Sequence, residues 1–121
     1  MKAIETISIP VTNQENAKKF YIDKLNFEVV FEGSSPDGNK WLQLAIPNDK
    51  TSITLVKGPE HAKSGSVKGT IISTDDIEAD QKYLKSKGVK LAPIQEMPFG
   101  KITSFSDPDG NEWVLRQAAN W

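Results

Sequence analysis

The chain has no cysteine and only one histidine among its 121 residues. Without cysteine it has no disulfides, no thiolate metal ligands and no thiol nucleophile. The single histidine, His61, is followed by Ala62-Lys63-Ser64-Gly65-Ser66 with no acid or nucleophile at motif spacing, which is typical of a solvated loop. The sequence therefore lacks the side chains for a histidine-ligated metalloenzyme.

An excess of charge of either sign is also missing. The chain has 15 Lys and Arg against 16 Asp and Glu, which excludes the basic surface of a typical nucleic-acid-binding domain. No apolar run approaches the roughly 18 residues of a membrane span, and Met1–Pro10 has no signal-peptide core. We therefore expect a cytoplasmic protein with neither nucleic-acid nor membrane partners, and the length suits one domain.

The first half of the chain reads as strand, helix and three strands. Ile4–Val11 alternates apolar and polar residues as a half-buried strand does. Asn13 can cap a helix that buries Ala17 and Phe20, and Asn26 can end it in the left-handed conformation. Turn-forming residues then separate three further strands, predicted at Phe27–Phe31, Lys40–Ile46 and Thr51–Val56.

The second half repeats this order after a polar connector, residues 59–66. Asp76 aligns with Asn13 as a helix cap, and Gly88 aligns with Asn26 as a helix end. The predicted strands are Val67–Thr74, a strand starting at Val89–Ala92, Phe99–Ser106 and Glu112–Arg116, the last two joined by the turn Asp107-Pro108-Asp109-Gly110-Asn111. The sequence thus predicts one domain of two modules, 1–58 and 67–121, paired into a curved mixed sheet with a cleft on its uncovered face.

Several short motifs carry a family resemblance over essentially the whole chain. They are Phe20-Tyr21, Leu25-Asn26-Phe27, Thr74-Asp75-Asp76-Ile77, Lys87-Gly88-Val89 and Asp107-Pro108-Asp109-Gly110-Asn111. In this order and spacing they resemble the glyoxalase, bleomycin-resistance and dioxygenase superfamily, also called vicinal oxygen chelate. The resemblance implies an α+β fold of two βαβββ units around a cleft, and a homodimer whose two chains border that cleft.

The resemblance also marks where enzymatic members hold a divalent metal. The three usual ligand positions fall on Thr6, Gly69 and Val114, and an optional fourth falls near Thr54. A catalytic divalent ion needs about three His, carboxylate or thiolate ligands and an open position. None of these residues qualifies, so we expect no metal cofactor and no metal-dependent glyoxalase or dioxygenase activity.

Strand parity assigns candidate residues to the cleft. If Thr6 faces it, so does Ser8, and on the last strand Glu112, Val114 and Arg116 do too, with Trp113 and Leu115 in the core. Arg116, the only arginine, could grip a carboxylate or phosphate, or could simply reach water or Glu112 at a strand end. Glu112 could act as a general base if burial raised its pKa.

Two aromatic segments are further candidates. Trp41 and Gln43 alternate with Leu42 and Leu44, so Trp41 could offer a stacking surface in the cleft, or could cover exposed sheet or a dimer contact. Glu96–Lys101 reads as a loop in which Phe99 and Lys101 could close one end of the cleft, although edge packing explains Phe99 equally well.

These residues support three hypotheses. The first is a metal-free protein that binds a small, partly apolar or aromatic molecule, with a resistance or sequestration role. The second is a lyase, isomerase or similar enzyme of the same superfamily with a non-standard site built on Glu112, Arg116 or Lys101. The third is an interaction module whose own side chains fill the cleft.

Overall fold

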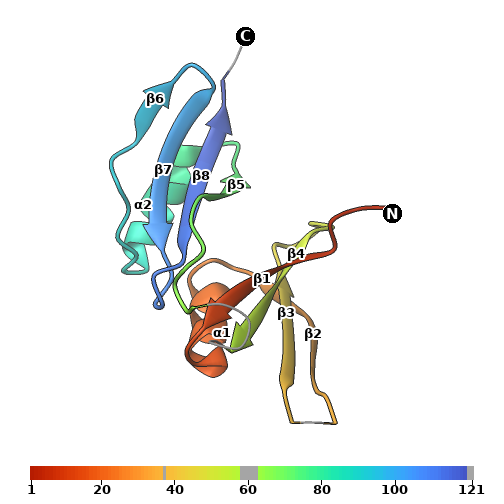
Figure 1. Cartoon of the computed structure of the whole chain (residues 1–121). Helices are drawn as coiled ribbons and strands as arrows, with labels where there is room; N and C mark the ends of the chain where they lie inside the picture. The colour runs from red at the N-terminus through yellow and green to blue at the C-terminus, as the bar shows by residue number, and fades with distance from the viewer. Residues whose placement is uncertain (37, 58–62, 120–121) are drawn as a thin grey trace.

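A computed structural model describes residues 1–36, 38–57 and 63–119, which include two helices and eight strands. Figure 1 shows the elements in chain order from red to blue. His61 and the first half of the predicted connector, residues 59–62, lie outside the described residues. The elements are β1 (Thr6–Val11), α1 (Gln14–Asp23), β2 (Glu28–Ser34), β3 (Lys40–Ala45), β4 (Ser52–Lys57), β5 (Thr70–Ser73), α2 (Ile77–Ser86), β6 (Gln95–Met97), β7 (Gly100–Ser106) and β8 (Glu112–Ala118).

Both helices begin at the predicted caps, and α2 ends just before the predicted Gly88, whereas α1 ends at Asp23, short of the predicted end at Asn26. The Asn13 side chain accepts a hydrogen bond from the Asn16 N–H at 3.0 Å, and the Asp76 side chain accepts one from the Ala79 N–H at 3.1 Å. Asn26 and Gly88 follow the helices with positive φ angles of 60° and 84°. In the described part of the chain, no helix is long and apolar enough to cross a membrane.

The strands form two four-stranded sheets with the same topology, β1-β4-β3-β2 in module 1 and β5-β8-β7-β6 in module 2. In each sheet the first and last strands of the module are parallel neighbours, and the remaining pairs are antiparallel. The registers repeat as well, since Ser8 pairs with Thr54 and Ile71 with Val114. The predicted α+β fold of two βαβββ units is confirmed, and the described strands divide into two sheets where the sequence suggested one continuous curved sheet.

The segment between α2 and β7 differs from the prediction. Residues 89–92 form no strand, and the Ala92 N–H makes a single bond to the Ser104 carbonyl before Pro93, which has no N–H to continue a ladder. The strand forms later, as β6. Glu96–Lys101 is therefore a hairpin and not a loop: Met97 pairs with Gly100 across a turn made by Pro98 and Phe99.

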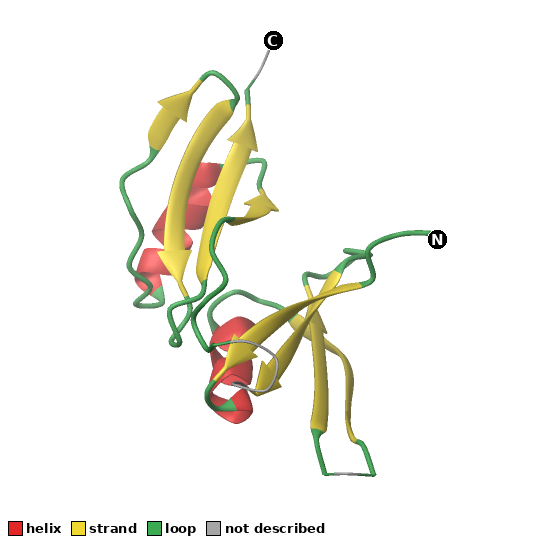
Figure 2. Cartoon of the chain, in the orientation of Figure 1, coloured by secondary structure: helices red, strands yellow, loops and turns green. Residues whose placement is uncertain are grey.

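One apolar cluster joins the two modules. Each helix covers one face of its own sheet (Figure 2), and buried residues from both helix-covered faces belong to the same cluster. Tyr21 of α1 lies 6.0 Å from Trp113 of β8 between ring centroids, and Phe27 lies 6.4 Å from the same ring. Because the helix-covered faces meet at this seam, the uncovered faces of the two sheets point away from it.

Candidate ligand-binding site

The uncovered face of module 1 has a hydrogen-bonded polar floor. The hydroxyls of Thr6 and Thr54 lie 2.8 Å apart. Beside them, the Trp41 indole N–H donates to Gln43 Oε1 at 3.1 Å, and Gln43 Nε2 donates to Ser52 Oγ at 2.7 Å. Thr54 and Ser52 are buried. We call this surface the module 1 open face.

The module 1 open face is uncharged over three of its four strands. By strand register, β1, β3 and β4 direct only neutral side chains to it; the acidic Glu28 lies on β2, at the outer edge of the sheet. Trp41 is 46% exposed and Phe31 of β2 is 56% exposed. The face therefore combines neutral donors and acceptors with accessible aromatic rings. Its members on β1, β3 and β4 are Thr6, Ser8, Pro10, Trp41, Gln43, Ala45, Ser52, Thr54 and Val56.

Sequence parity placed most of these residues but left some out. Leu42 and Leu44 are fully buried in the core, so Trp41 and Gln43 lie on the open face. Ser52 was not among the predicted site residues, although the alternation along residues 51–56 could have shown that it shares a face with Thr54. Phe31 was missed because the sequence does not reveal the register shift between Val29 and Phe31.

The uncovered face of module 2, the module 2 open face, is more aliphatic. Ile71 is 59% exposed and its register partner Val114 is half-buried, while Trp113 and Leu115 are buried on the other side as predicted. The Arg116 guanidinium donates from Nε and Nη2 to the Phe99 carbonyl, at 3.1 and 2.8 Å. Arg116 thus supports the β6–β7 turn, a role that neither sequence-based interpretation of this residue included.

Lys101 lies on the wrong side for a cleft residue. It pairs with Gln117 in the sheet, on the helix-covered face, and its Nζ lies 2.8 Å from Glu78 Oε1 of α2. This contact lowers the pKa of the Glu78 carboxyl and raises that of the Lys101 ammonium. The structure therefore places Lys101 on the helix-covered face, because the two-residue turn positions it differently from the expected loop, and its part in ligand binding stays a prediction.

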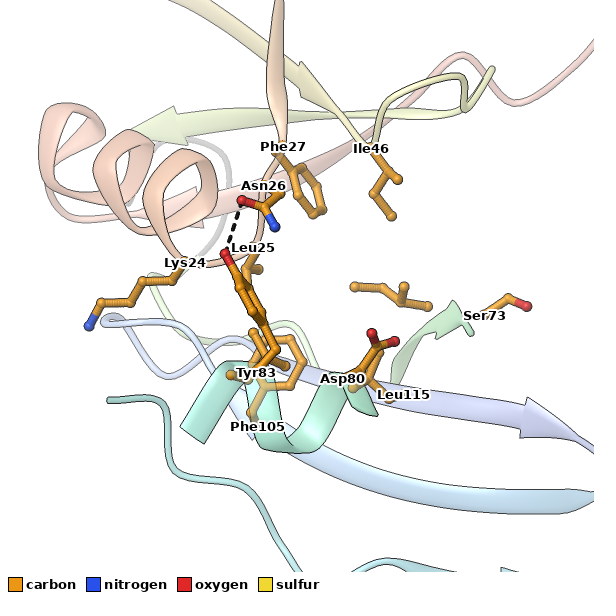
Figure 3. A pocket seen from close by; sticks show the side chains of 12 residues that line it. Lys24, Leu25, Asn26, Phe27, Ile46, Ser73, Asp80, Tyr83, Phe105 and Leu115 are labelled. Carbon is orange, nitrogen blue, oxygen red and sulfur yellow. Dashed lines mark hydrogen bonds between the residues drawn. The ribbon is translucent and has the colours of Figure 1, made fainter. Parts of the chain in front are cut away.

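Three pockets lie between the modules, each lined by residues of both. The pocket in Figure 3, of about 200 Å³, lies between the α1–β2 segment and module 2, where the Tyr83 hydroxyl reaches Asn26 Oδ1 at 3.3 Å. A larger pocket of about 510 Å³ shares Phe27, Ile46 and Ile72 with it. A third, of about 610 Å³, contains the half-buried Glu112. Neither Thr6 nor Trp41 lines any of these three pockets.

The residues at the family's metal positions do not fit a metal. Thr6 and Thr54 are adjacent, as the resemblance implies, but they offer neutral hydroxyls already bonded to each other. Gly69 has no side chain and Val114 has an alkyl one. Within residues 1–36, 38–57 and 63–119, no group of three His, Asp or Glu side chains could hold an ion. This donor set differs from the carboxylate and imidazole ligands of divalent metal sites.

Comparison with known families decides the identity of the fold. A family model for the "Glyoxalase/Bleomycin resistance protein/Dioxygenase superfamily" matches residues 3–115. The chain belongs to this superfamily. Among sequence relatives, the uncharacterized protein YetH of Bacillus subtilis (strain 168) is 27% identical and covers 97% of this chain and 99% of its own length.

Solved structures of other superfamily members are similar over nearly the whole chain. TnmS3 of Streptomyces sp. CB03234, described as an antibiotic binding protein, has a TM-score of 0.92 and 34% identity, and 98% of each chain is covered. A superfamily member from Sphaerobacter thermophilus DSM 20745 has a TM-score of 0.88 and 32% identity, covering 97% of this chain and 98% of its own.

Proposed function

We propose that this superfamily member binds a small, uncharged, planar aromatic molecule on the module 1 open face without a metal ion. The observation that carries the proposal is the uncharged floor of hydroxyl and amide groups beside two accessible aromatic rings. A ligand with a ring system would stack on Trp41 and Phe31. Its hydroxyl or carbonyl groups would exchange hydrogen bonds with Ser8, Thr6 and Gln43.

A charged ligand would be disfavoured on this face. Burying a neutral polar group without a hydrogen-bond partner costs about 1–3 kcal/mol. Burying an ionised group without a partner of opposite charge costs more, several kcal/mol. A neutral aromatic ligand avoids the second cost and can satisfy the hydroxyls that it covers. The description of TnmS3 as an antibiotic binding protein supports a sequestration or resistance role here.

The proposal includes a second copy of the chain that completes the cleft. The two open faces point away from the shared core, so one chain does not bring them together. The module 2 open face exposes Ile71, and its hairpin turn exposes Phe99, which is 47% accessible. A homodimer would place such an apolar surface from one chain opposite the module 1 open face of the other and enclose the ligand.

A non-standard enzyme is the weaker candidate, because its proposed acid, base and anion-binding groups do not converge. Lys101 is paired with Glu78, and Arg116 is bound to the Phe99 carbonyl. Glu112 lies at the start of β8, where its backbone N–H donates to the Val67 carbonyl at 2.8 Å. Acid–base chemistry requires such groups within reach of a common substrate atom.

The experiment compares two probes with the same ring system, 2-naphthol and 2-naphthoate, by calorimetry and by quenching of tryptophan fluorescence. We expect the neutral naphthol to bind and the anion not to bind. Trp41→Ala should weaken binding about tenfold, the effect of losing one stacking contact. Tyr83→Ala, which removes an exposed aromatic ring outside the open face, is the matched control and should leave the affinity unchanged.

Four outcomes would contradict parts of the proposal. Preferred binding of 2-naphthoate would show that the site is cationic, and equal losses in Trp41→Ala and Tyr83→Ala would place binding elsewhere. Elemental analysis of the purified protein tests the metal claim, since a stoichiometric divalent metal whose removal abolishes naphthol binding would overturn it. Light scattering should give the mass of a dimer. The mass of a monomer at all concentrations would contradict the proposal that two chains share the cleft.

A further inference from the structure

The turn between β7 and β8 does more than join two strands. It is the Asp107-Pro108-Asp109-Gly110-Asn111 segment, which sequence reasoning treated as an ordinary hairpin turn. Its two ends are buried: Asp107 is 5% exposed and Asn111 is fully inaccessible. A hairpin turn is normally on the surface, so this burial requires another explanation.

The buried Asp107 carboxylate has four donors. Oδ1 accepts from the backbone N–H groups of Asp109 and Asn111, both at 2.9 Å. Oδ2 accepts from Asn111 Nδ2 at 2.9 Å and from the Tyr21 hydroxyl at 2.7 Å. The first three donors belong to the turn itself, whereas Tyr21 belongs to α1 of module 1. The carboxylate therefore shapes the turn and also binds the other module.

Further contacts of the turn cross the seam. Asn111 Nδ2 also donates to the Pro10 carbonyl at 2.9 Å, and the Thr12 N–H donates to Asp109 Oδ1 at 2.8 Å. The Trp113 indole N–H donates to the Tyr21 oxygen at 3.0 Å. Burial and the neighbouring Asp107 raise the pKa of Tyr21 far above its ordinary value, so Tyr21 stays a donor at all ordinary pH values. Within the described residues, no buried side-chain nitrogen or oxygen is left unpaired.

The connector between the modules also packs against this turn. Gly65 has a φ of +78°, and a Cβ there would lie 2.1 Å from the Asp109 carbonyl oxygen. The Val67 N–H donates to Asn111 Oδ1 at 3.2 Å, and the Glu112 N–H donates to the Val67 carbonyl. The turn is thus held by module 1 on one side and by the end of the connector on another.

We propose that this network, formed by Tyr21, Asp107, Asn111 and Trp113, is a lock that fixes the orientation of one module relative to the other. The geometry supports this role because Pro10 belongs to β1 and Trp113 belongs to β8, the strands that carry Thr6 and Val114 on the two open faces. Tyr21 and Asn111 are then positioning residues: both are fully buried, and they set the direction in which each open face points.

An apolar seam alone would not give the same result. Hydrophobic contacts are non-directional and tolerate repacking, whereas a carboxylate with four donors accepts one geometry. The three pockets between the modules show that the contact between them is incompletely filled. A polar lock would restrict sliding and rotation that the partly filled apolar seam permits.

The experiment measures the distance between the two helices directly. Lys19→Cys on α1 and Lys82→Cys on α2 are exposed positions in a chain with no other cysteine, so spin labels attach only there. Labelled protein is mixed with excess unlabelled protein, so that the pulsed dipolar signal reports distances within one chain. We expect one narrow distance distribution, and at least about twofold broadening in Tyr21→Phe, as modules gain rigid-body freedom.

Tyr83→Phe is the matched control, because it removes the other tyrosine hydroxyl, whose bond to Asn26 also crosses the seam but is exposed and 3.3 Å long. Its distribution should stay narrow. A folded Tyr21→Phe with the original width would overturn the inference. If Tyr21→Phe does not fold, Trp113→Phe, which removes the buried indole N–H that donates to Tyr21, decides instead: broadening supports the lock and the original width overturns it. These readouts need no ligand, so they are independent of the proposed function.

Discussion

The β3–β4 turn of module 1 and the β7–β8 turn of module 2 join equivalent strands of the repeat, but only the second is part of the seam. In the first turn the Asp49 carboxylate accepts from the Thr51 N–H at 3.0 Å, and Asp49 is exposed. In the second, the Asp107 carboxylate is buried and bonded to the other module. Aspartates in corresponding turns of the repeat thus make different contacts: Asp49 bonds within its own turn, whereas Asp107 also bonds to the other module.

The two open faces differ in the same way. Thr54 and Val114 occupy equivalent register positions opposite Ser8 and Ile71. The first pair contributes to a polar floor and the second to an aliphatic surface. The backbone of the repeat has been kept while the chemistry of each face has diverged, and for this reason we assign ligand contacts to one face and enclosure to the other.

The largest expected effect tests whether the modules are one folding unit. Leu42 is fully buried in module 1, within the cluster that extends into module 2. We expect Leu42→Ala to lower the free energy of unfolding by about 2–5 kcal/mol, through lost burial and the cavity left behind. Urea unfolding should remain one transition. A second transition, in which module 2 unfolds separately, would show that the modules are not one folding unit. Val30→Ala, at a half-exposed site, is the control.

A smaller effect separates the two turns. Asp107→Ala leaves the Tyr21 hydroxyl and the Asn111 amide without their buried acceptor, so we expect a loss of about 3 kcal/mol in unfolding free energy. Asp49→Ala removes one exposed bond and should cost less than about 1 kcal/mol. Chemical denaturation of the two variants checks this order, and equal losses would show that the seam turn has no special role.

Exchanging the paired residues of the open faces gives the next effect. Thr54→Val removes the buried hydroxyl bonded to Thr6 and should cost about 1 kcal/mol of stability. It should also weaken 2-naphthol binding if the polar floor contacts the ligand. The reciprocal change, Val114→Thr, should leave the affinity unchanged. An unchanged affinity in Thr54→Val would remove this hydroxyl from the proposed site.

The smallest effect concerns surface ion pairs. Lys40 contacts both Glu15 and Glu32 in module 1, whereas Lys101 contacts only Glu78 in module 2. Lys18, which also contacts Glu32, and these two lysines hold the pKa of all three carboxyls below the ordinary value of 4.5. The stabilisation from these ion pairs is therefore present above that value and is lost as the pH falls through the lowered pKa of the folded state.

The midpoints of urea unfolding between about pH 6 and about pH 3 would measure this pH dependence. Lys40→Met should flatten the curve more than Lys101→Met, because Glu15 loses its partner and Glu32 loses one of its two, whereas Lys101→Met affects Glu78 alone. Added salt should reduce both effects. A larger flattening in Lys101→Met would show that the ion pair of module 2 contributes more pH-dependent stability than those of module 1.

Much of the fold could be predicted because its signals are local. Asn13 and Asp76 cap helices through contacts three residues away, and Asn26 and Gly88 end them through a backbone preference of each residue alone. Strand β6 was misplaced because Pro93 and the Pro98-Phe99 turn shift the pairing in a way that apolar alternation does not record. The alternation that placed Trp41, Gln43 and Val114 missed Phe31, where a register shift intervenes. Lys101 was expected in a loop, and the short turn before it places it in β7 instead.

By itself, the sequence determined the two βαβββ modules, the family and the residue types at the metal positions, because caps, alternation and side-chain chemistry are properties of short segments. Only the tertiary structure decided that Asp107 reaches Tyr21 and that Arg116 supports the Phe99 turn. It likewise showed that the open faces point away from a shared seam. Those facts depend on side chains 17 to 86 residues apart in the chain, and no local pattern records which distant partner satisfies a buried polar group.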